Sequence, residues 1–382
     1  MVATRSTLPP PEPLAAEHSA RLHVAIAAAI RSAGGWIPFD RYMELALYAP
    51  GLGYYAAGAR KFGDSAAGGD FVTAPEISPL FAAGLATQAE QAFARVPARI
   101  VEFGAGSGVL ARDLLAALAA RGVMVERYSI VELSPDLVAR QRALLQGRDV
   151  EWLSTPPDGF EGVMLANEVL DVMPVRLFVK RGGAARERGV GLQDDRLLFV
   201  ERDADVELSE AVAGIERDVG PLPEGYGSEV GLAAAAWMRS SAGWLARGLL
   251  LAIDYGFPRR EYYHLQRLMG TLMCHYRHHA HADPLWLPGL NDITAHVDFT
   301  AMADAAHGAG LDVLGYTTQA HFLMNCGLLD QLRAGHSLRR ANEVQRLLSE
   351  AEMGELFKVL AVGRGLADPL VGFARGDRIG RL

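Results

Sequence analysis

The spacing of hydrophobic residues changes near residue 99. Before this point, residues 14–33 are rich in alanine and carry apolar side chains at helical intervals, which predicts a helix. Residues 61–78 form a long glycine-rich stretch that indicates a loop. Ser78 followed by Pro79 is typical of the cap and first turn of another helix. We therefore expect a helical N-terminal part that contains one long loop.

After residue 99, short apolar runs alternate with amphipathic segments. The runs predict strands and the segments between them predict helices, as expected of a parallel sheet covered on both faces. The expected strands are 99–106, 127–133, 162–169, 248–257, 311–318 and 356–365, and the expected helices are 109–122, 134–147 and 297–310. The fold class is therefore α/β.

Two segments interrupt this alternation. Residues 175–229 contain short alternating runs that predict a β-hairpin, followed by a loop rich in glycine and proline. Residues 258–296 are rich in histidine, arginine and aromatic residues. We therefore divide the chain into a lead-in and helical cap with the glycine-rich loop (1–97) and a main domain with two insertions (98–382).

Composition excludes several kinds of protein. The 382 residues carry a formal net charge of −8 without a run of lysine or arginine, which argues against binding to nucleic-acid phosphates. The only two cysteines do not form a CxxC motif, so neither a disulfide framework nor a thiolate zinc site is expected. No apolar run is long enough to span a membrane, and the N-terminus lacks a signal pattern. We expect a cytoplasmic protein.

A glycine loop follows the first strand of the main domain. The sequence "VEFGAGSGVL" places Gly104, Gly106 and Gly108 between a strand and a helix, with Ala105 and Ser107 between them. Glycines permit a tight turn, and the N-terminus of the following helix offers free N–H groups to an anion. The next strand ends in an acid, Glu132, whose carboxylate is suited to both ribose hydroxyls of an adenosine cofactor.

Two adenosine cofactors fit such a loop. The dinucleotide fingerprint of nicotinamide enzymes requires a third glycine where this chain has Val109. S-adenosylmethionine is favoured, because the loop N–H groups suit its carboxylate and Glu102, just before the loop, suits its ammonium group. In an alternative interpretation, Glu102 forms a structural pair with a neighbouring lysine or arginine.

The strand at 162–169 ends in an unusual polar group. In "GVMLANEVLDVMPV", Asn167, Glu168 and Asp171 follow a run of apolar residues. Two acids beside an apolar strand repel each other and lose hydration unless a cation lies between them. A guanidinium group suits bidentate pairing with carboxylates, so Glu168 and Asp171 are candidate substrate-binding acids. Alternatively, Glu168 caps the next helix and Asp171 pairs with Arg176.

Four stretches together indicate a family. The sequences "GDFVTAPEIS", "VEFGAGSGVLARDLL", "LANEVLDVMPV" and "LPGLNDITAHVDF" resemble the MidA-like family of S-adenosylmethionine-dependent methyltransferases, which includes the mitochondrial complex I assembly factor that methylates an arginine. The resemblance extends from about Ile37 to Gly365. It implies a class I methyltransferase with a Rossmann-like, seven-stranded sheet whose last strand is antiparallel. It also implies an arginine-containing protein substrate, and it makes Glu168 and Asp171 the candidate catalytic pair.

Two further segments carry candidate functional residues. The glycine-rich loop with Phe71, Thr73 and Glu76 is a candidate lid over the cofactor, and Thr73 is a candidate cofactor contact. The run "CHYRHHAHAD" at 274–283 concentrates histidines, but it lacks the ligand spacing of a zinc site, so no metal is expected. The candidate cofactor residues are Thr73, Glu102, Gly104, Ala105, Gly106, Ser107, Gly108, Glu132 and Asn167.

Three other functions have less support in this sequence. A non-catalytic assembly factor would retain the fold and bind a partner protein. A nicotinamide oxidoreductase is disfavoured by Val109 and by the absence of a Tyr-x-x-x-Lys pair. Methylation of a nucleic-acid base is disfavoured because "NEVL" stands where such enzymes carry an Asn/Asp-Pro-Pro-aromatic turn.

Overall fold

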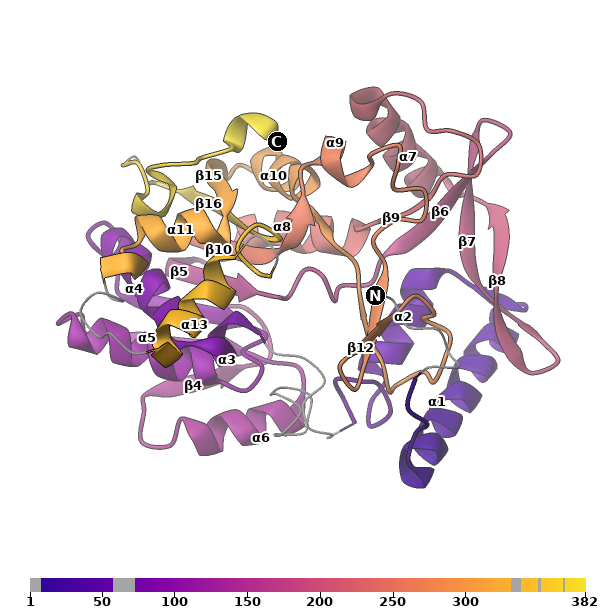
Figure 1. Cartoon of the computed structure of the whole chain (residues 1–382), viewed down its shortest axis with the longest axis horizontal. Coiled ribbons are helices and arrows are strands. Elements are labelled where there is room, and N and C mark those ends of the chain that lie inside the picture. Colours follow the sequence, from indigo (N-terminus) through magenta and orange to yellow (C-terminus); the bar gives the residue numbers. More distant parts are fainter. Residues whose placement is uncertain (1–7, 58–72, 331–337, 350–351, 367) are drawn as a thin grey trace. The chain divides into compact units, whose positions relative to one another are not determined.

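The computed structural model describes residues 8–57, 73–330, 338–349, 352–366 and 368–382 (Figure 1). The described residues form two compact units. The insertion unit comprises residues 8–57, 171–234 and 257–298, and the sheet unit comprises 73–170, 235–256 and the described part of 299–382. Residues 73–97 thus belong with the sheet, which differs from the division at residue 97 suggested by the sequence.

The sheet unit is built on one long sheet. Its strands lie in the order β15-β16-β10-β5-β2-β3-β4 (Figure 1). β4, β3, β2, β5 and β10 are parallel, whereas β16 is antiparallel to both of its neighbours. The bounds are β2 Arg99–Phe103, β3 Arg127–Val131, β4 Val150–Leu153, β5 Phe160–Asn167, β10 Leu245–Phe257, β15 Asp312–Thr318 and β16 Phe357–Arg364. The seven strands of this path, with an antiparallel last strand, confirm the expected sheet, and the short strand β14 (Val297–Asp298) is an eighth strand of it.

Helices flank this sheet and bury apolar faces in its core. Phe81, Leu85 and Ala89 of α4 are each 1% exposed and belong to the same hydrophobic core as the strand residues Ile100 and Val163. These α4 residues recur at intervals of four, as the helical period requires. The helices are α3 Ala74–Ile77, α4 Pro79–Phe93, α5 Val109–Ala120, α6 Pro135–Leu144, α8 Leu232–Trp244, α10 Phe299–Gly308, α11 Gln319–Asn325 and α13 Leu338–Leu348, with short 3₁₀ turns at Val371–Phe373 and Ile379–Arg381.

Two helix starts in the sheet unit follow directly from the sequence. The Ser78 side chain accepts a hydrogen bond from the Leu80 N–H at the start of α4. The Ser134 side chain accepts one from the Leu137 N–H at the start of α6. In both helices a proline occupies the first position, where its missing N–H has no cost. The structure therefore confirms the cap expected at Ser78 and shows the same arrangement at Ser134.

The insertion unit contains two small antiparallel sheets. The larger sheet has the order β1-β7-β6-β9 with β8 also paired to β7, and the smaller has the order β12-β11-β13. The strands of these two sheets are β1 Trp36–Ile37, β6 Arg176–Arg181, β7 Ala184–Gln193, β8 Arg196–Asp203, β9 Gly227–Val230, β11 Met273–Tyr276, β12 His279–His281 and β13 Asp292–Thr294. The helices are α1 Pro13–Ser32, α2 Phe39–Tyr48, α7 Val206–Val219 and α9 Arg259–Tyr262.

The first insertion is more ordered than its sequence suggests. Where the sequence predicts a hairpin, the structure has three consecutive antiparallel strands, β6, β7 and β8. The helix α7 occupies much of the segment that was expected to be a loop. Asp205 caps this helix by accepting a hydrogen bond from the Leu208 N–H. Leu208, Val212 and Ile215 then bury one face of the helix. Their interval of four and three residues is a helical signal that the sequence interpretation missed.

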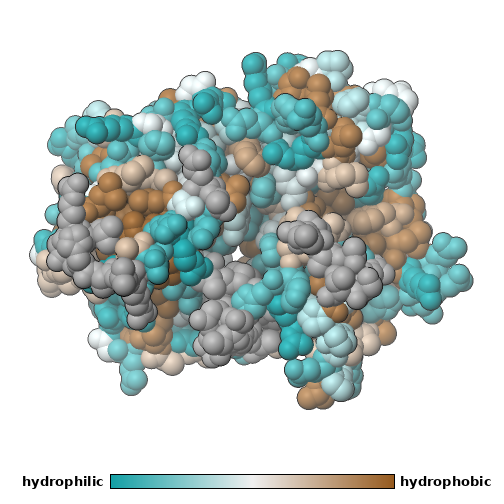
Figure 2. Space-filling model, in the orientation of Figure 1, coloured by the Kyte–Doolittle hydropathy of each residue, from teal (hydrophilic) through white to brown (hydrophobic). Residues whose placement is uncertain are grey.

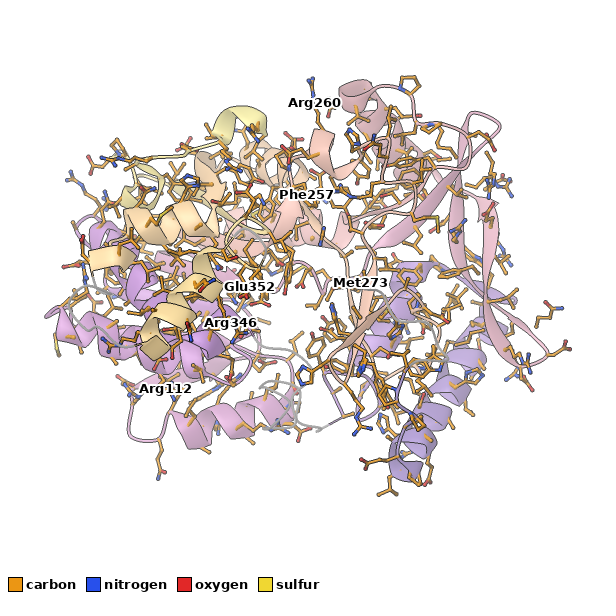
Figure 3. The ribbon with its side chains drawn as sticks, viewed as in Figure 1. Arg112, Phe257, Arg260, Met273, Arg346 and Glu352 are labelled. Carbon is orange, nitrogen blue, oxygen red and sulfur yellow. The ribbon has the colours of Figure 1, made fainter. Side chains whose placement is uncertain are left out.

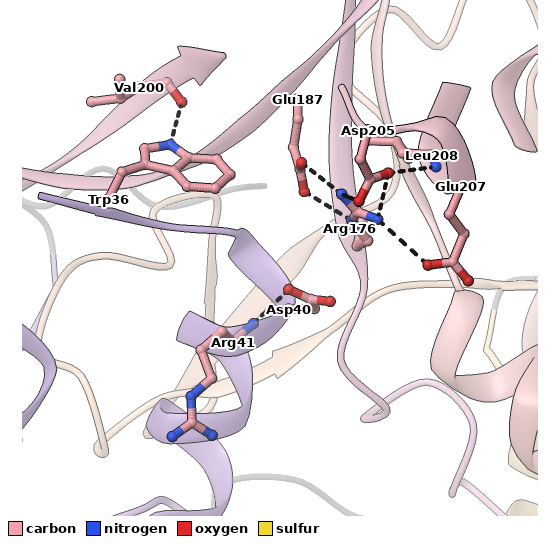
Figure 4. A network of polar contacts seen from close by, with 9 residues as sticks. All are labelled: Trp36, Asp40, Arg41, Arg176, Glu187, Val200, Asp205, Glu207 and Leu208. Carbon is pink, nitrogen blue, oxygen red and sulfur yellow. Dashed lines mark hydrogen bonds and ion pairs between the residues drawn. The ribbon is translucent and has the colours of Figure 1, made fainter. Parts of the chain in front are cut away.

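A buried arginine links three elements of the insertion unit (Figure 4). Arg176 donates two hydrogen bonds of 2.8 and 2.6 Å to Glu187 on β7 and one of 3.0 Å to Asp205 at the start of α7. Burial lowers the pKa of Arg176, but the hydrogen bonds that it donates to these two carboxylates raise the pKa overall. Because Arg176 is held by Glu187, Asp205 and the more distant Glu207, the alternative pairing with Asp171 is wrong.

The surface carries isolated apolar side chains among polar ones. Figure 2 shows brown, hydrophobic residues between larger teal areas on the face that it presents. Leu14, Met124 and Val206 are more than 70% exposed. No helix within the described ranges is long and apolar enough to cross a membrane.

Candidate functional site

The glycine loop connects β2 to α5 in a conformation that favours glycine. Gly104, Gly106 and Gly108 all have positive φ angles, of 59°, 54° and 83°. A Cβ atom on Gly104 would lie 3.2 Å from Val169 Cγ2, and one on Gly108 would lie 3.3 Å from Gln141 Cγ. Both the backbone conformation and the available space therefore require small residues in this loop.

The serine of the loop is bound by a residue from an earlier segment. Ser107 Oγ donates a hydrogen bond of 2.5 Å to Glu76 Oε1 on α3. Arg112, which is labelled in Figure 3, follows the loop on α5. The pKa of Arg112 is raised, mainly by its hydrogen bond to Asp113, and the negative charge of Glu76 acts in the same direction. Thr73 begins α3, and its carbonyl oxygen accepts a hydrogen bond from the Glu76 N–H. The segment after Thr73 is thus attached to the glycine loop.

The described residues include only part of the candidate lid. Residues 61–72 of this loop, including Phe71, lie outside the described residues. Only its last part, from Thr73 to Ser78, is described, and it consists mainly of the short helix α3. The lid therefore stays a prediction from the sequence.

Glu132 lies immediately after β3, next to the glycine loop in the parallel sheet. Its carboxylate accepts hydrogen bonds from the Ser134 N–H (3.0 Å) and from Gln141 Nε2 (3.1 Å). Burial raises the pKa of Glu132, and these two donors oppose that effect by stabilising the charged form. Because β2 and β3 are parallel neighbours, Glu132 and the loop lie at the same edge of the sheet.

Glu102 is buried on β2, two residues before the loop. It is 3% exposed, and the Tyr128 hydroxyl donates a hydrogen bond of 2.6 Å to its Oε2. Burial raises the pKa of Glu102 to about 7, with the charge of Glu132 acting in the same direction. The partner of Glu102 is therefore a tyrosine, and not the lysine or arginine considered as an alternative.

Asn167 is the last residue of β5, and Glu168 follows it directly. Glu168 has a φ angle of 54°, in the left-handed region that side chains other than glycine rarely adopt. Its N–H donates to the Ile253 carbonyl (2.9 Å), and Asn167 Nδ2 donates to its Oε1 (3.2 Å). Within the described part of the chain, the buried Asn167 Oδ1 has no hydrogen-bond partner. A strained acid beside such an acceptor is typical of functional sites.

Asp171 belongs to the insertion unit and is described with it. It is 4% exposed, and its carbonyl oxygen accepts a hydrogen bond from the Ala295 N–H (2.9 Å). Its charge acts on Tyr55, whose hydroxyl donates to Asp292 Oδ1 (2.9 Å). Burial, followed by the charges of Asp292 and Asp171, raises the pKa of Tyr55 well above its usual value. The pairing of Asp171 with Glu168 stays a prediction from the sequence.

The histidine-rich run contributes to internal packing. His281 is buried and its Nε2 lies 3.1 Å from Asn291 Oδ1, whereas the exposed His279 contacts the Arg277 carbonyl. Cys274 is also buried, and burial raises its pKa well above the usual value. Among the residues with described positions, no group of three or more histidine, cysteine, aspartate or glutamate side chains is arranged to hold a metal ion.

One part of this site was missed by the sequence interpretation. Gln141, on α6, donates from Nε2 to the Gly106 carbonyl (2.9 Å) and to Glu132, while Trp152 Nε1 donates to its Oε1 (2.9 Å). A glutamine within "SPDLVARQRALLQG" has no pattern that separates it from a solvent-exposed one. Together, the loop, Glu132 and Glu102 place backbone N–H groups and two acids at one sheet edge, as an adenosine cofactor with an amino-acid tail requires.

Comparison with known proteins agrees with this geometry. Residues 82–317 match the sequence model of a family of S-adenosyl-L-methionine-dependent methyltransferases. The chain is 28% identical to the mitochondrial protein arginine methyltransferase NDUFAF7 of Danio rerio, covering 86% of this chain and 84% of that protein. It is also 28% identical to the Drosophila melanogaster homolog, covering 96% and 92%.

A solved structure is more similar still. A Burkholderia thailandensis protein described as a "likely methyl transferase", crystallised with bound S-adenosyl-homocysteine, is 52% identical and has a TM-score of 0.93, covering 98% of this chain and 100% of that one.

The relatives also correct one expectation. The related arginine methyltransferases are named as mitochondrial proteins, which contradicts the cytoplasmic location expected from the sequence. That assignment is withdrawn. The family expected from the four sequence stretches is confirmed, as is the cofactor. The chain belongs to the MidA-like family of S-adenosylmethionine-dependent methyltransferases.

Proposed function

We propose that this methyltransferase transfers its methyl group to an arginine side chain of a partner protein, and that Glu168 and Asp171 hold the guanidinium group. The observation that carries this proposal is the left-handed backbone of Glu168 (φ 54°), which is fixed by the hydrogen bond to the Ile253 carbonyl. Such a conformation costs on the order of 1–3 kcal/mol and is retained where an acid must have a defined direction. The names of the curated relatives support arginine as the substrate.

Residues of the sheet edge fit the cofactor. The Gly104 and Gly108 N–H groups donate to the Val131 and Ala105 carbonyls, so the N–H groups of the three residues between these glycines are those that suit the methionine carboxylate. Glu102 suits the ammonium group and Glu132 suits the ribose hydroxyls. Asn167 Oδ1, which has no partner among the described residues, offers an acceptor that a bound ligand would satisfy. Thr73 is proposed as a further contact because Glu76, on the helix that it begins, reaches the loop. The bound sulfonium supplies an electrophilic methyl group.

The two acids would contribute by positioning and by charge. Carboxylates pair with a guanidinium through two parallel hydrogen bonds, which fixes the plane of the group. Holding the reacting nitrogen about 3 Å from the methyl carbon provides much of the rate of an in-line displacement. The acids would also keep the positive charge on the nitrogens they bind, so the remaining nitrogen is more nucleophilic. The new N–C bond forms as the S–C bond breaks, and that nitrogen then loses a proton.

The partner protein is part of the same proposal. The resemblance to the complex I assembly factor makes complex I subunits the first candidates for the arginine-containing partner. The alternative function, a non-catalytic assembly factor, predicts binding of such a partner without methyl transfer.

The test compares Glu168→Gln and Asp171→Asn with the unmodified protein. Each change preserves shape but removes one charge-assisted hydrogen bond to the substrate, worth about 1.5–3 kcal/mol. Methyl transfer to candidate complex I subunits, followed by mass spectrometry, should fall about 10- to 150-fold in kcat/KM. S-adenosyl-homocysteine affinity should change only a few-fold. The control is Glu161→Gln, near the other end of β5, which should leave transfer unchanged.

The outcomes separate the two functions. Full activity in both variants would contradict the role of the acids, although the protein would still be a methyltransferase. Tight partner binding with no methylated product from the unmodified protein would favour the assembly factor.

A further inference from the structure

Gln141 makes three hydrogen bonds from a fully buried position. Its Nε2 donates to the Gly106 carbonyl (2.9 Å) and to Glu132 Oε2 (3.1 Å), and its Oε1 accepts from Trp152 Nε1 (2.9 Å). One amide therefore bridges the glycine loop after β2 and the acid after β3. These are the two places to which we assign the methionine and ribose parts of the cofactor.

The orientation of this amide is determined by its neighbours. The indole N–H of Trp152 is only a donor, so it must face the amide oxygen of Gln141. The two N–H groups of the amide then point to two acceptors, the Gly106 carbonyl and the Glu132 carboxylate. Trp152 is itself covered by the guanidinium of Arg142, which lies 5.1 Å from the ring centroid. Such a fully satisfied buried network has one arrangement.

The remaining contacts of Glu132 explain why a donor is needed here. Its other oxygen, Oε1, accepts from the Ser134 N–H, so both oxygens are held by donors of α6, one at its cap and one within it. Burial raises the pKa of Glu132 overall, and the hydrogen bonds from the Ser134 N–H and the Gln141 amide oppose part of that rise. An ionised carboxylate is the form that accepts two ribose hydroxyl bonds.

We propose that Gln141 is a positioning residue for the cofactor: it joins the glycine loop to Glu132 and fixes the distance between the methionine-binding and ribose-binding parts of the site. This inference rests on the proposed cofactor role of Glu132 and the loop. Gln141 itself need not touch the cofactor. A purely structural glutamine would stabilise α6 without any effect on the charge state of Glu132.

Two substitutions test this role by titration with S-adenosyl-homocysteine between pH 5.5 and 8.5. Gln141→Leu removes both donors, so affinity should fall about tenfold or more at every pH. Gln141→Glu retains the acceptor for Trp152 but places a carboxyl group against the Gly106 carbonyl and Glu132. At pH 5.5 this carboxyl is protonated and donates a hydrogen bond, so the affinity of the variant should be close to that of the unmodified protein. Between pH 5.5 and pH 8.5 the affinity of the variant should fall at least tenfold more than that of the unmodified protein.

A matched control adds the same charge nearby. Gln146→Glu changes an exposed glutamine five residues further along, and its affinity should follow that of the unmodified protein at each pH. Wild-type affinity in Gln141→Leu, or a pH dependence in Gln141→Glu equal to that of the control, would overturn the proposal. A lower melting temperature without these changes in affinity would show a structural role only.

A separate variant distinguishes this inference from the assignment on which it rests. Glu132→Ala should abolish most S-adenosyl-homocysteine binding. If Glu132→Ala binds normally, the ribose assignment fails, and with it the role of Gln141. If Glu132→Ala loses binding while both Gln141 variants retain it, only the role of Gln141 fails.

Discussion

Ser107 in the glycine loop donates a hydrogen bond to Glu76, which precedes it by 31 residues in the chain. Glu76 lies on α3, before the first strand of the sheet, so the loop is supported by a segment outside the strand–loop–helix unit that contains it. This contact gives the sequence "TAPEIS" a physical role. Glu76 binds the Ser107 side chain of the loop, and Gln141 binds the Gly106 carbonyl of the same loop.

The first prediction concerns this contact. Ser107→Ala leaves the Glu76 carboxylate without its donor and frees the loop, so S-adenosyl-homocysteine affinity should fall about tenfold. Glu76→Gln retains an acceptor and should have a smaller effect. Calorimetric titration measures both. The control is Glu90→Gln on α4, which removes the charge that pairs with Arg121 at an exposed position and should leave binding normal. Equal affinity in all four proteins would show that the contact has no influence on the loop.

The second prediction follows from Glu102. Its pKa is about 7 in the folded protein and lower in the unfolded chain. At pH values between these two pKa values, the folded protein therefore binds one more proton than the unfolded chain. The contribution of Glu102 to stability is therefore fully present below its unfolded pKa and is lost as the pH rises through about 7, by about 3 kcal/mol in total. Glu102→Gln should remove this loss. Urea unfolding should show similar stability for both proteins at pH 5 and a more stable variant at pH 8.

The same residue predicts a proton linkage with the ligand. If Glu102 supports the ammonium group, binding of S-adenosyl-homocysteine stabilises its ionised form and releases a proton near pH 6.5. Calorimetry in two buffers of different ionisation enthalpy measures this release. Glu102→Gln should release none, and proton release equal to that of the unmodified protein would place the ammonium elsewhere.

The third prediction uses the glycine conformation. Gly106→Val introduces a β-branched side chain at a φ angle of 54°, where the methionine part is expected to bind. S-adenosyl-homocysteine binding should be lost while the protein remains folded, as judged by circular dichroism. The matched control is Gly147→Val, which has the similar φ angle of 79° with no atom within 4 Å of its added Cβ. Normal binding by Gly106→Val would show that the loop is only structural.

The fourth prediction concerns Arg176. Its side chain and that of Glu187 are 9% and 5% exposed, so Arg176→Met leaves an unpaired buried carboxylate and should cost about 3–5 kcal/mol of unfolding free energy. The double variant Arg176→Met with Glu187→Leu should recover much of this loss. Urea denaturation measures both. Arg31→Ala removes an exposed pair with Asp195 and should have no measurable effect. An equally small loss for Arg176→Met would contradict the network.

These contacts show which features the sequence could reveal. The glycine loop, the caps at Ser78 and Ser134 and the acid Glu132 depend on local geometry, and residues close in sequence encode them. The family resemblance supplied the antiparallel last strand. Contacts such as Gln141 with Gly106 join residues 35 positions apart, and no local pattern indicates such a bond. The prediction of a loop in place of α7 failed for another reason: the glycine- and proline-rich segment that follows the helix (220–225) obscured the helical period of Leu208, Val212 and Ile215.

The division of each unit among three separate segments of the chain determines when each can form. On the ribosome, the insertion unit lacks its last segment until residue 298 has been made, although its first helix is complete after Ser32. The sheet unit waits still longer, because β16, which pairs with both β10 and β15, ends at Arg364. Helices that emerge early must therefore remain soluble without their partners for most of synthesis. A truncated chain that ends before β16 would leave two strands of the sheet unpaired on that side.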